Sequence, residues 1–208
     1  MSRAGRYYLV IFVLSSTLYF LAGLFNSLPF QQSRIVDIST SLDGIYYNVH
    51  AVWFYILYYL ILIYPVWGCK TYEEAVELGR TVISFSLFSC LIFVLMPVEV
   101  YRPSAALLGE SLSGLAVRII YGLDQPYNCF PSLHALHSWV IAIFFARRRS
   151  QYDPTSLLLI FAAAAVTVST ITIRQHYVMD VLGGLFLATA WSWWTKDSST
   201  RQPSMSYQ

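Results

Sequence analysis

The residues best suited to chemistry in this sequence are two histidines and an aspartate near the starts of two apolar segments. His176 and Asp180 stand four residues apart, so they share one face where a helix begins. A carboxylate beside an imidazole fixes its tautomer and leaves the other nitrogen free, which suits a nucleophilic or general-base histidine. An interfacial ion pair that helps a helix to dock explains this pair equally well.

The third residue, His134, belongs to the motif Pro131-Ser132-Leu133-His134. Proline and serine favour a helix start, where the serine side chain can cap the helix. The free amides at such a start favour anions, phosphate among them. We therefore expect His134 beside a bound anion, where it can protonate a leaving oxygen. His137, three residues later, is expected to play a structural or supporting role.

Two arginines are expected on the same side as the histidines. The guanidinium groups of Arg102 and Arg174 can each clamp two phosphate oxygens. Arg174 stands two residues before His176, so it reaches the site only if the chain there is not yet helical. Phosphoryl transfer mainly requires positioning and charge stabilisation, which these residues supply.

A metal cofactor is not expected. The sequence holds no cluster of Asp and Glu for magnesium. Two histidines and a carboxylate could hold zinc in principle, but the arginines favour an anion in the site over a dication. The three cysteines, Cys69, Cys90 and Cys129, fit no zinc or redox spacing and are interpreted as small apolar filler.

The composition indicates a membrane protein. The chain of 208 residues is 57% hydrophobic and 12% charged, whereas soluble domains carry about 25% charged residues. Much of its surface must therefore face a bilayer. The net charge of +2, with no basic run interleaved with aromatic residues in a polar setting, argues against a nucleic-acid partner.

Six apolar segments are interpreted as membrane spans, because a helix needs about 17–25 residues to cross a bilayer. They are Tyr7–Phe25, Ala51–Gly68, Thr81–Val98, Leu133–Ala146, Thr155–Ile173 and Val181–Trp194. The fourth and sixth are short unless they extend into the polar residues before them, which places the ionisable groups at the membrane boundary. We expect an all-α polytopic membrane protein with a six-span domain (1–195) and a polar cytoplasmic tail (196–208).

The distribution of Lys and Arg predicts the orientation. These residues gather before the first span, between the second and third, after the fourth, and after the sixth. The positive-inside rule then places both termini in the cytoplasm and the motifs on the extracytoplasmic face. Apolar residues recur at helical intervals over 104–121, which predicts an amphipathic helix at the outer interface. The short chain without sorting signals favours a bacterial inner membrane.

The motifs resemble those of the type 2 phosphatidate phosphatase superfamily, which also includes vanadium haloperoxidases and bacterial acid phosphatases. Arg102-Pro103 matches the end of its first motif, and residues 131–134 match its second. Ser169, His176 and Asp180 match its third. The Phe-Pro-Ser-Leu-His form is similar to a branch near inositol phosphorylceramide synthases.

This resemblance implies a mechanism in which His176 attacks phosphorus to form a phosphohistidine. Asp180 would orient His176, and His134 would protonate the departing group. Arg102, Ser132 and backbone amides would hold the phosphoryl oxygens. The implied active site is extracytoplasmic on a six-helix core, and the implied substrate is a lipid phosphate.

Three positions depart from the motifs. Leu95 stands where the first motif has lysine, Thr170 where the third has arginine, and Leu133 where the second has glycine. Two cations are thereby missing, and Arg174 is the candidate substitute.

Several functions stay open at this point. A lipid-phosphate phosphatase is favoured, with a lipid phosphotransferase that passes a phospho-headgroup to a second lipid as the alternative. A proton-coupled transporter and a structural membrane subunit belong to other classes, and the missing inverted repeat counts against the transporter. The sequence names neither the lipid nor the oligomeric state.

Overall fold

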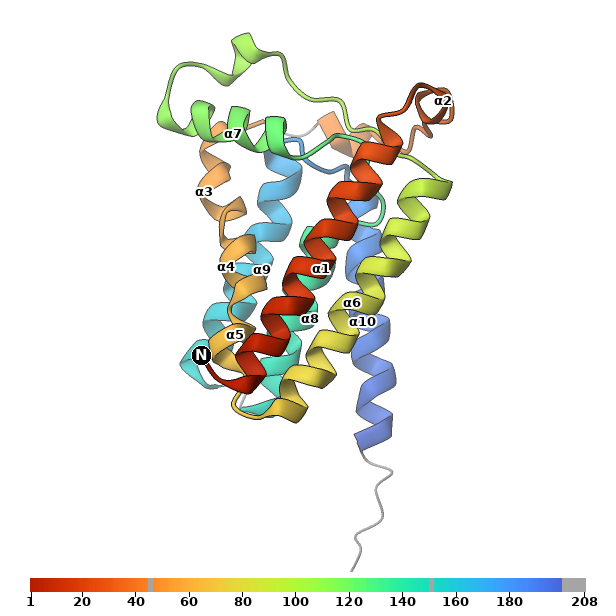
Figure 1. Ribbon diagram of the computed structural model, residues 1–208. Helices are drawn as coiled ribbons and strands as arrows, with labels where there is room; N and C mark the ends of the chain where they lie inside the picture. The colour runs from red at the N-terminus through yellow and green to blue at the C-terminus, as the bar shows by residue number, and fades with distance from the viewer. Residues whose placement is uncertain (45–46, 150–151, 200–208) are drawn as a thin grey trace, which may run out of the picture.

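The computed structural model describes residues 1–44, 47–149 and 152–199, and over these ranges the protein is built from helices (Figure 1). Val98 forms isolated parallel β-bridges with Val36 and Asn128 in the loops at one end of the bundle. The all-α prediction is confirmed for the described residues.

Five long helices and one segmented helix make up the bundle. The long helices are α1 (Arg3–Asn26), α6 (Tyr72–Leu95), α8 (Leu133–Arg148), α9 (Pro154–Thr172) and α10 (Val178–Ser199). The segmented helix comprises η2 (Val49–Ala51), α3 (Val52–Tyr55), α4 (Leu57–Ile63) and α5 (Pro65–Gly68). Short elements occupy the connections, namely α2 (Pro29–Gln32), η1 (Ser41–Gly44), η3 (Ala105–Leu108) and α7 (Leu112–Leu123).

The six helical runs alternate in direction along the bundle (Figure 1). α1 rises from the N-terminus to the end where α2 and α7 lie, and α10 runs back from that end. α1 packs along α6, and α8 packs against both α9 and α10. Because of this alternation, the loops that carry the sequence motifs gather at the α7 end.

Four helical segments are long and apolar enough to cross a membrane, which indicates a membrane protein. They are Arg3–Asn26, Val49–Gly68, Tyr72–Leu95 and Pro154–Thr172. α8, with 16 residues, is shorter than a typical span. Length and composition therefore support four of the six predicted spans.

The third predicted span, Thr81–Val98, had the wrong boundaries. α6 begins at Tyr72, because the Thr71 side chain caps the helix by accepting from the amide of Glu74. Acidic residues in the first turn also complement the helix dipole. Capping, which hydropathy does not measure, sets this end of the helix.

The prediction of one amphipathic helix over 104–121 was also wrong in its extent. The segment splits into η3 and α7, because Gly109 lies between them with φ of 67°, a left-handed conformation that glycine adopts readily. α7 then starts after Ser111, whose side chain accepts from the amide of Gly114. Figure 1 shows α7 lying across the end of the bundle.

The arginine triplet at the end of α8 joins this helix to three others. Arg147 donates to side-chain and backbone oxygens in α10. Arg148 pairs with Glu77 in α6, and Arg149 donates to the carbonyl of Gly68 in α5 at 2.6 Å. These contacts fix α8 at the end opposite to the motif loops.

The motif-bearing starts of α8 and α10 touch directly. The Ser132 amide donates to the backbone carbonyl of Asp180 at 2.9 Å. A Cβ on Gly184 would lie 2.5 Å from the Ser132 carbonyl oxygen, so this approach requires glycine. The contact places the first turn of α8 beside the first turn of α10.

We expect Gly184→Ala to destabilise the protein by about 1–3 kcal/mol, because the added methyl group forces the two helix starts apart. Thermal unfolding of the detergent-purified protein measures this change. Gly122→Ala in α7 is the matched control, since a Cβ there would meet nothing within 4 Å. Equal unfolding midpoints for Gly184→Ala and the unsubstituted protein would show that the close approach is not required.

Candidate active site

His134 lies in the first turn of α8, as the motif predicts. Ser132 precedes the helix, and its hydroxyl accepts from the amide of Ala135 at 3.3 Å. The predicted helix start and serine cap are therefore confirmed. His134 is 5% exposed, so its ring nitrogens interact with protein groups rather than with bulk solvent.

His176 lies before α10, in the turn that follows α9, and not on the helix as predicted. α10 begins at Val178, whose amide donates to the Asp43 carboxylate in η1 at 2.7 Å. Asp180 then accepts from the amide of Tyr177 at 2.8 Å, the backward reach of a capping box. The expected contact is still present, because His176 Nδ1 lies 3.4 Å from Asp180 Oδ2.

A chain of hydrogen bonds connects the two histidines with a tyrosine and the carboxylate. His134 Nδ1 lies 3.0 Å from His176 Nε2, and His134 Nε2 lies 2.7 Å from the hydroxyl of Tyr55 in α3. With a carboxylate at Asp180 and both imidazoles neutral, one proton assignment satisfies every contact. Tyr55 donates to His134, His134 donates to His176, and His176 donates to Asp180.

Tyr55 was not predicted to be part of the site. Its ring is fully buried, and its hydroxyl is the group that fixes the tautomer of His134. Tyr58, one helical turn away, packs against His134 with ring centroids 4.3 Å apart and the rings tilted, but its hydroxyl reaches His137 instead. Tyr55 lies in an aromatic-rich span, where one tyrosine carries no distinguishing signal.

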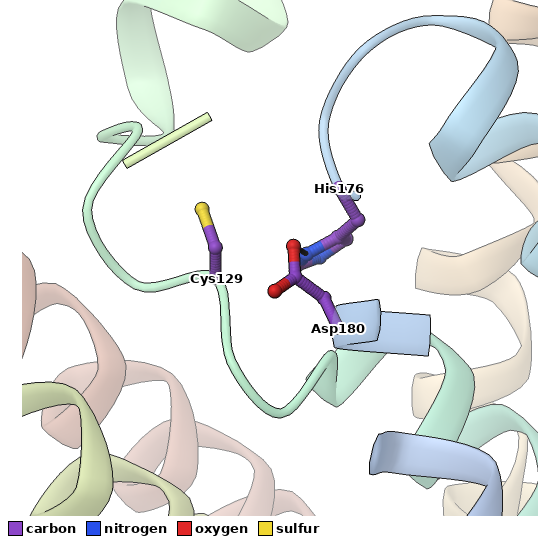
Figure 2. A group of neighbouring side chains, drawn as sticks. All are labelled: Cys129, His176 and Asp180. Carbon is purple, nitrogen blue, oxygen red and sulfur yellow. Dashed lines mark hydrogen bonds and ion pairs between the residues drawn. The ribbon is translucent and has the colours of Figure 1, made fainter. Parts of the chain in front are cut away.

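Cys129 lies in the same cluster as His176 and Asp180. Figure 2 shows His176, from the loop after α9, lying against Asp180 at the start of α10, with Cys129 next to them on the loop before α8. Their possible ligand atoms all lie within 4.8 Å of one another, and these residue types are common zinc ligands. Burial raises the pKa of the Cys129 thiol, and the nearby carboxylates of Asp180 and Asp124 raise it further.

Arg102 is anchored at the edge of the cluster. One of its terminal nitrogens donates to the carbonyls of Tyr121 and Asp124, and the other donates to the Gln175 side chain. Its guanidinium also lies over the Tyr121 ring, 4.5 Å from the centroid. Gln175 adjoins His176 in sequence, so these contacts bring the arginine next to the histidine loop.

Asp124 is a buried acid that the sequence interpretation missed. Its carboxylate accepts from the Tyr19 hydroxyl in α1 and, at 3.4 Å, from Gln175. Burial raises the pKa of Asp124, while the Tyr19 hydroxyl and then the charges of Arg102 and His176 oppose that rise. The position of this acidic residue directly after an apolar helical segment was the sequence signal that could have identified it.

Arg174 lies in a non-helical part of the chain, which is the condition under which its side chain can reach the site. It lies in the turn before α10 with φ of 56°, so the chain there is not helical. Burial raises the pKa of Tyr121, and the charges of both Arg102 and Arg174 oppose that rise. Arg102 and Arg174 therefore both lie close enough to Tyr121 for their charges to influence its pKa.

An apolar cavity of about 480 Å³ opens beside His134. It lies between α1, α4, α7 and α8, and Leu133 forms part of its wall. His134 and Asp124 stand at its polar side, whereas Phe12, Leu62 and other apolar side chains line the remainder. This volume is in the usual range for small-ligand pockets, about 300–1,000 Å³.

Comparison with known families gives one match. The family model of the PAP2 superfamily matches residues 98–203, about half of the chain. The matched interval includes Arg102, His134, His176 and Asp180. No curated protein and no solved structure matches the chain.

We expect Tyr55→Phe to lower kcat about tenfold with little change in KM, because one hydrogen bond that orients His134 is lost. Steady-state turnover of a phosphate ester measures both constants. Tyr58→Phe is the control, since it keeps the ring against His134 and removes only the contact with His137. Equal losses in the two variants would indicate general loosening rather than a role for the Tyr55 hydroxyl.

Proposed function

Because the chain belongs to the PAP2 superfamily, and this membership suggests a phosphatase or phosphotransferase that acts on lipid phosphates, we propose that it is an integral membrane lipid-phosphate phosphatase. The proposal includes a phosphohistidine intermediate and no metal requirement. The observation that carries it is the directional hydrogen-bond chain from Tyr55 through His134 and His176 to Asp180.

In the proposed first step, His176 Nε2 attacks phosphorus. An N–P bond forms while the bond from phosphorus to the lipid oxygen breaks. His134 enters this step as an imidazolium, with its second proton taken from solvent, and gives the Nδ1 proton to that oxygen. The imidazole of His176 gains positive charge, which the Asp180 carboxylate stabilises. In the second step water attacks the phosphohistidine, His134 accepts its proton, and phosphate leaves.

Substrate binding must change one contact that is present in the structure. His134 Nδ1 and His176 Nε2 are 3.0 Å apart, so a phosphoryl group reaches His176 only by replacing their hydrogen bond. Attacking and leaving atoms lie on opposite sides of phosphorus in such a transfer. The two imidazoles therefore separate, and His134 turns toward the leaving oxygen.

Several groups are placed to hold the phosphoryl oxygens. The first amides of α8 point out of the helix start beside Ser132, which favours an anion. Arg102 lies beside the loop of His176, and its Nε is buried without a hydrogen-bond partner among the described residues. Arg174 is proposed to replace the missing motif cations.

The cavity beside His134 supports a lipid substrate. A phosphate at the histidines would have an apolar space of about 480 Å³ next to it, suited to a hydrocarbon chain. Ser15, Ser16 and Tyr19 from α1 also line this space and can contact the polar linkage of a lipid. A soluble phosphate ester would leave the cavity without an apolar occupant.

A six-span topology fits this proposal. The alternating helices place the site at the α7 end and the arginine triplet at the other (Figure 1). With positive charge inside, both termini are cytoplasmic, the site is extracytoplasmic, and α7 lies at the outer interface. A bacterial inner membrane is the proposed location. Residues 200–208 of the predicted tail lie outside the described residues.

A lipid phosphotransferase is the second candidate, and Leu133 favours it. This residue replaces the motif glycine and lies on the cavity wall beside His134. An apolar wall at that point disfavours water and admits a second lipid. The acceptor alcohol of that lipid would then receive the phospho-headgroup from His176.

The main test is phosphate release by detergent-purified protein from a panel of lipid phosphates in the presence of a chelator. We expect release by the unsubstituted protein, none by His176→Ala because the nucleophile is missing, and a large loss of rate with retained binding in Asp180→Asn. Activity that chelators abolish and zinc restores would contradict the metal-free mechanism. Without release from any lipid, the same samples are given lipid alcohols and assayed for a new headgroup product.

We expect Ser16→Trp, which fills the cavity from α1, to lower kcat/KM for a long-chain lipid phosphate at least tenfold, about 1.4 kcal/mol. Turnover of a short, water-soluble phosphate ester should stay unchanged, because the histidines are untouched. Val13→Trp is the control, since Val13 lies on α1, is exposed and does not line the cavity. Equal losses for both substrates would place the lipid chain elsewhere.

A further inference from the structure

We propose that Cys129, His176 and Asp180 form an inhibitory binding site for zinc or a similar thiophilic divalent cation. The inhibition rests on the proposed function, because the cation would take a nitrogen of the nucleophilic histidine. The binding itself does not depend on catalysis, so it can be measured separately.

The ligand chemistry fits zinc. A thiolate, an imidazole and a carboxylate are all usual zinc ligands, and three protein ligands plus water complete a tetrahedral site. The possible ligand atoms of Cys129, His176 and Asp180 lie within 4.8 Å of one another and need only close in slightly. Magnesium would bind poorly, because it prefers six oxygen ligands.

A second observation points to a ligand at this position. Asp180 is fully buried, yet its Oδ1 has no hydrogen-bond partner among the described residues. A buried carboxylate oxygen without a partner is costly, so a cation there would remove a penalty that the protein now bears. Oδ2 already accepts from the Tyr177 amide and His176, which leaves Oδ1 for the metal.

A surface pocket lies next to the triad. It has a volume of about 500 Å³ and is lined by Asp37, Glu99, Arg102, Pro126 and other residues. The Pro126 carbonyl at this pocket accepts from the Cys129 thiol at 3.0 Å, so the pocket adjoins the triad. Its two carboxylates outnumber the Arg102 guanidinium, so the net charge of the lining favours a cation.

Metal binding would inactivate His176 as a nucleophile by changing its tautomer. The proposed attack needs a lone pair on Nε2, which exists while Nδ1 carries the proton donated to Asp180. A cation bound at Nδ1 displaces that proton, and a neutral imidazole then carries its proton on Nε2. The thiol of Cys129 loses its proton to solvent, so one proton is released for each cation bound.

The activity test uses phosphate release by detergent-purified protein with added Zn²⁺ or Mg²⁺. We expect Zn²⁺ to inhibit and Mg²⁺ to have no effect at the same concentration. In Cys129→Ser and Cys129→Ala, with inhibition measured relative to each variant's own activity without added metal, the half-inhibiting Zn²⁺ concentration should rise at least tenfold. Cys90→Ser is the matched control, because Cys90 lies in α6 outside the triad. Equal zinc sensitivity in all variants would overturn the proposal.

The binding test uses Co²⁺, whose bond to a thiolate gives a charge-transfer absorption band. We expect this band in the unsubstituted protein and in Cys90→Ser, and its loss in Cys129→Ser and Cys129→Ala. A band in a protein that releases no phosphate would keep the metal site and reject the proposed phosphatase. Active protein without the band would reject the metal site and keep the phosphatase.

Discussion

The hydrogen bond from the Ser132 amide to the Asp180 carbonyl fixes two helix starts against each other, and the candidate site depends on this contact. α8 brings His134 from one side, while the turn before α10 brings His176 from the other. Gly184 makes the approach possible, because a side chain there would collide with the Ser132 carbonyl. The geometry of the histidines is thus set by backbone packing, and their own hydrogen bond of 3.0 Å follows from it.

The buried polar groups of the site are arranged so that almost every one has a partner. This matters because an unpaired polar group in a low-dielectric interior costs free energy, and a paired one is strengthened there. Among the described residues next to His176, the exceptions are Arg102 Nε and Asp180 Oδ1. The first is a donor beside the proposed phosphate position, and the second is an acceptor beside Cys129. An anion and a cation, respectively, are the ligands that would satisfy them.

Much of this architecture could be predicted from the sequence, because apolar segment length fixes the number and order of the long helices. The ends of the helices were harder to predict from the sequence. α10 starts at Val178 because Asp43, distant in sequence, binds its first amide. The motifs of the candidate site were recognisable because the residues within each motif are close in sequence. Tyr55 was not recognisable, since it comes from a separate segment and joins the site only through tertiary packing. Cys129 stands next to the Pro131–His134 motif, but only tertiary packing brings it close to His176 and Asp180.

The loss of motif cations constrains the substrate. Leu95 and Thr170 are uncharged where the resembled motifs have lysine and arginine, and Arg102 already donates to two carbonyls and an amide side chain. A phosphate monoester carries about two negative charges at neutral pH, whereas a phosphodiester carries one. Under the proposed function, a site with fewer cations would bind the dianion less favourably than the monoanion, and this difference in charge is the argument for the phosphotransferase as the second candidate.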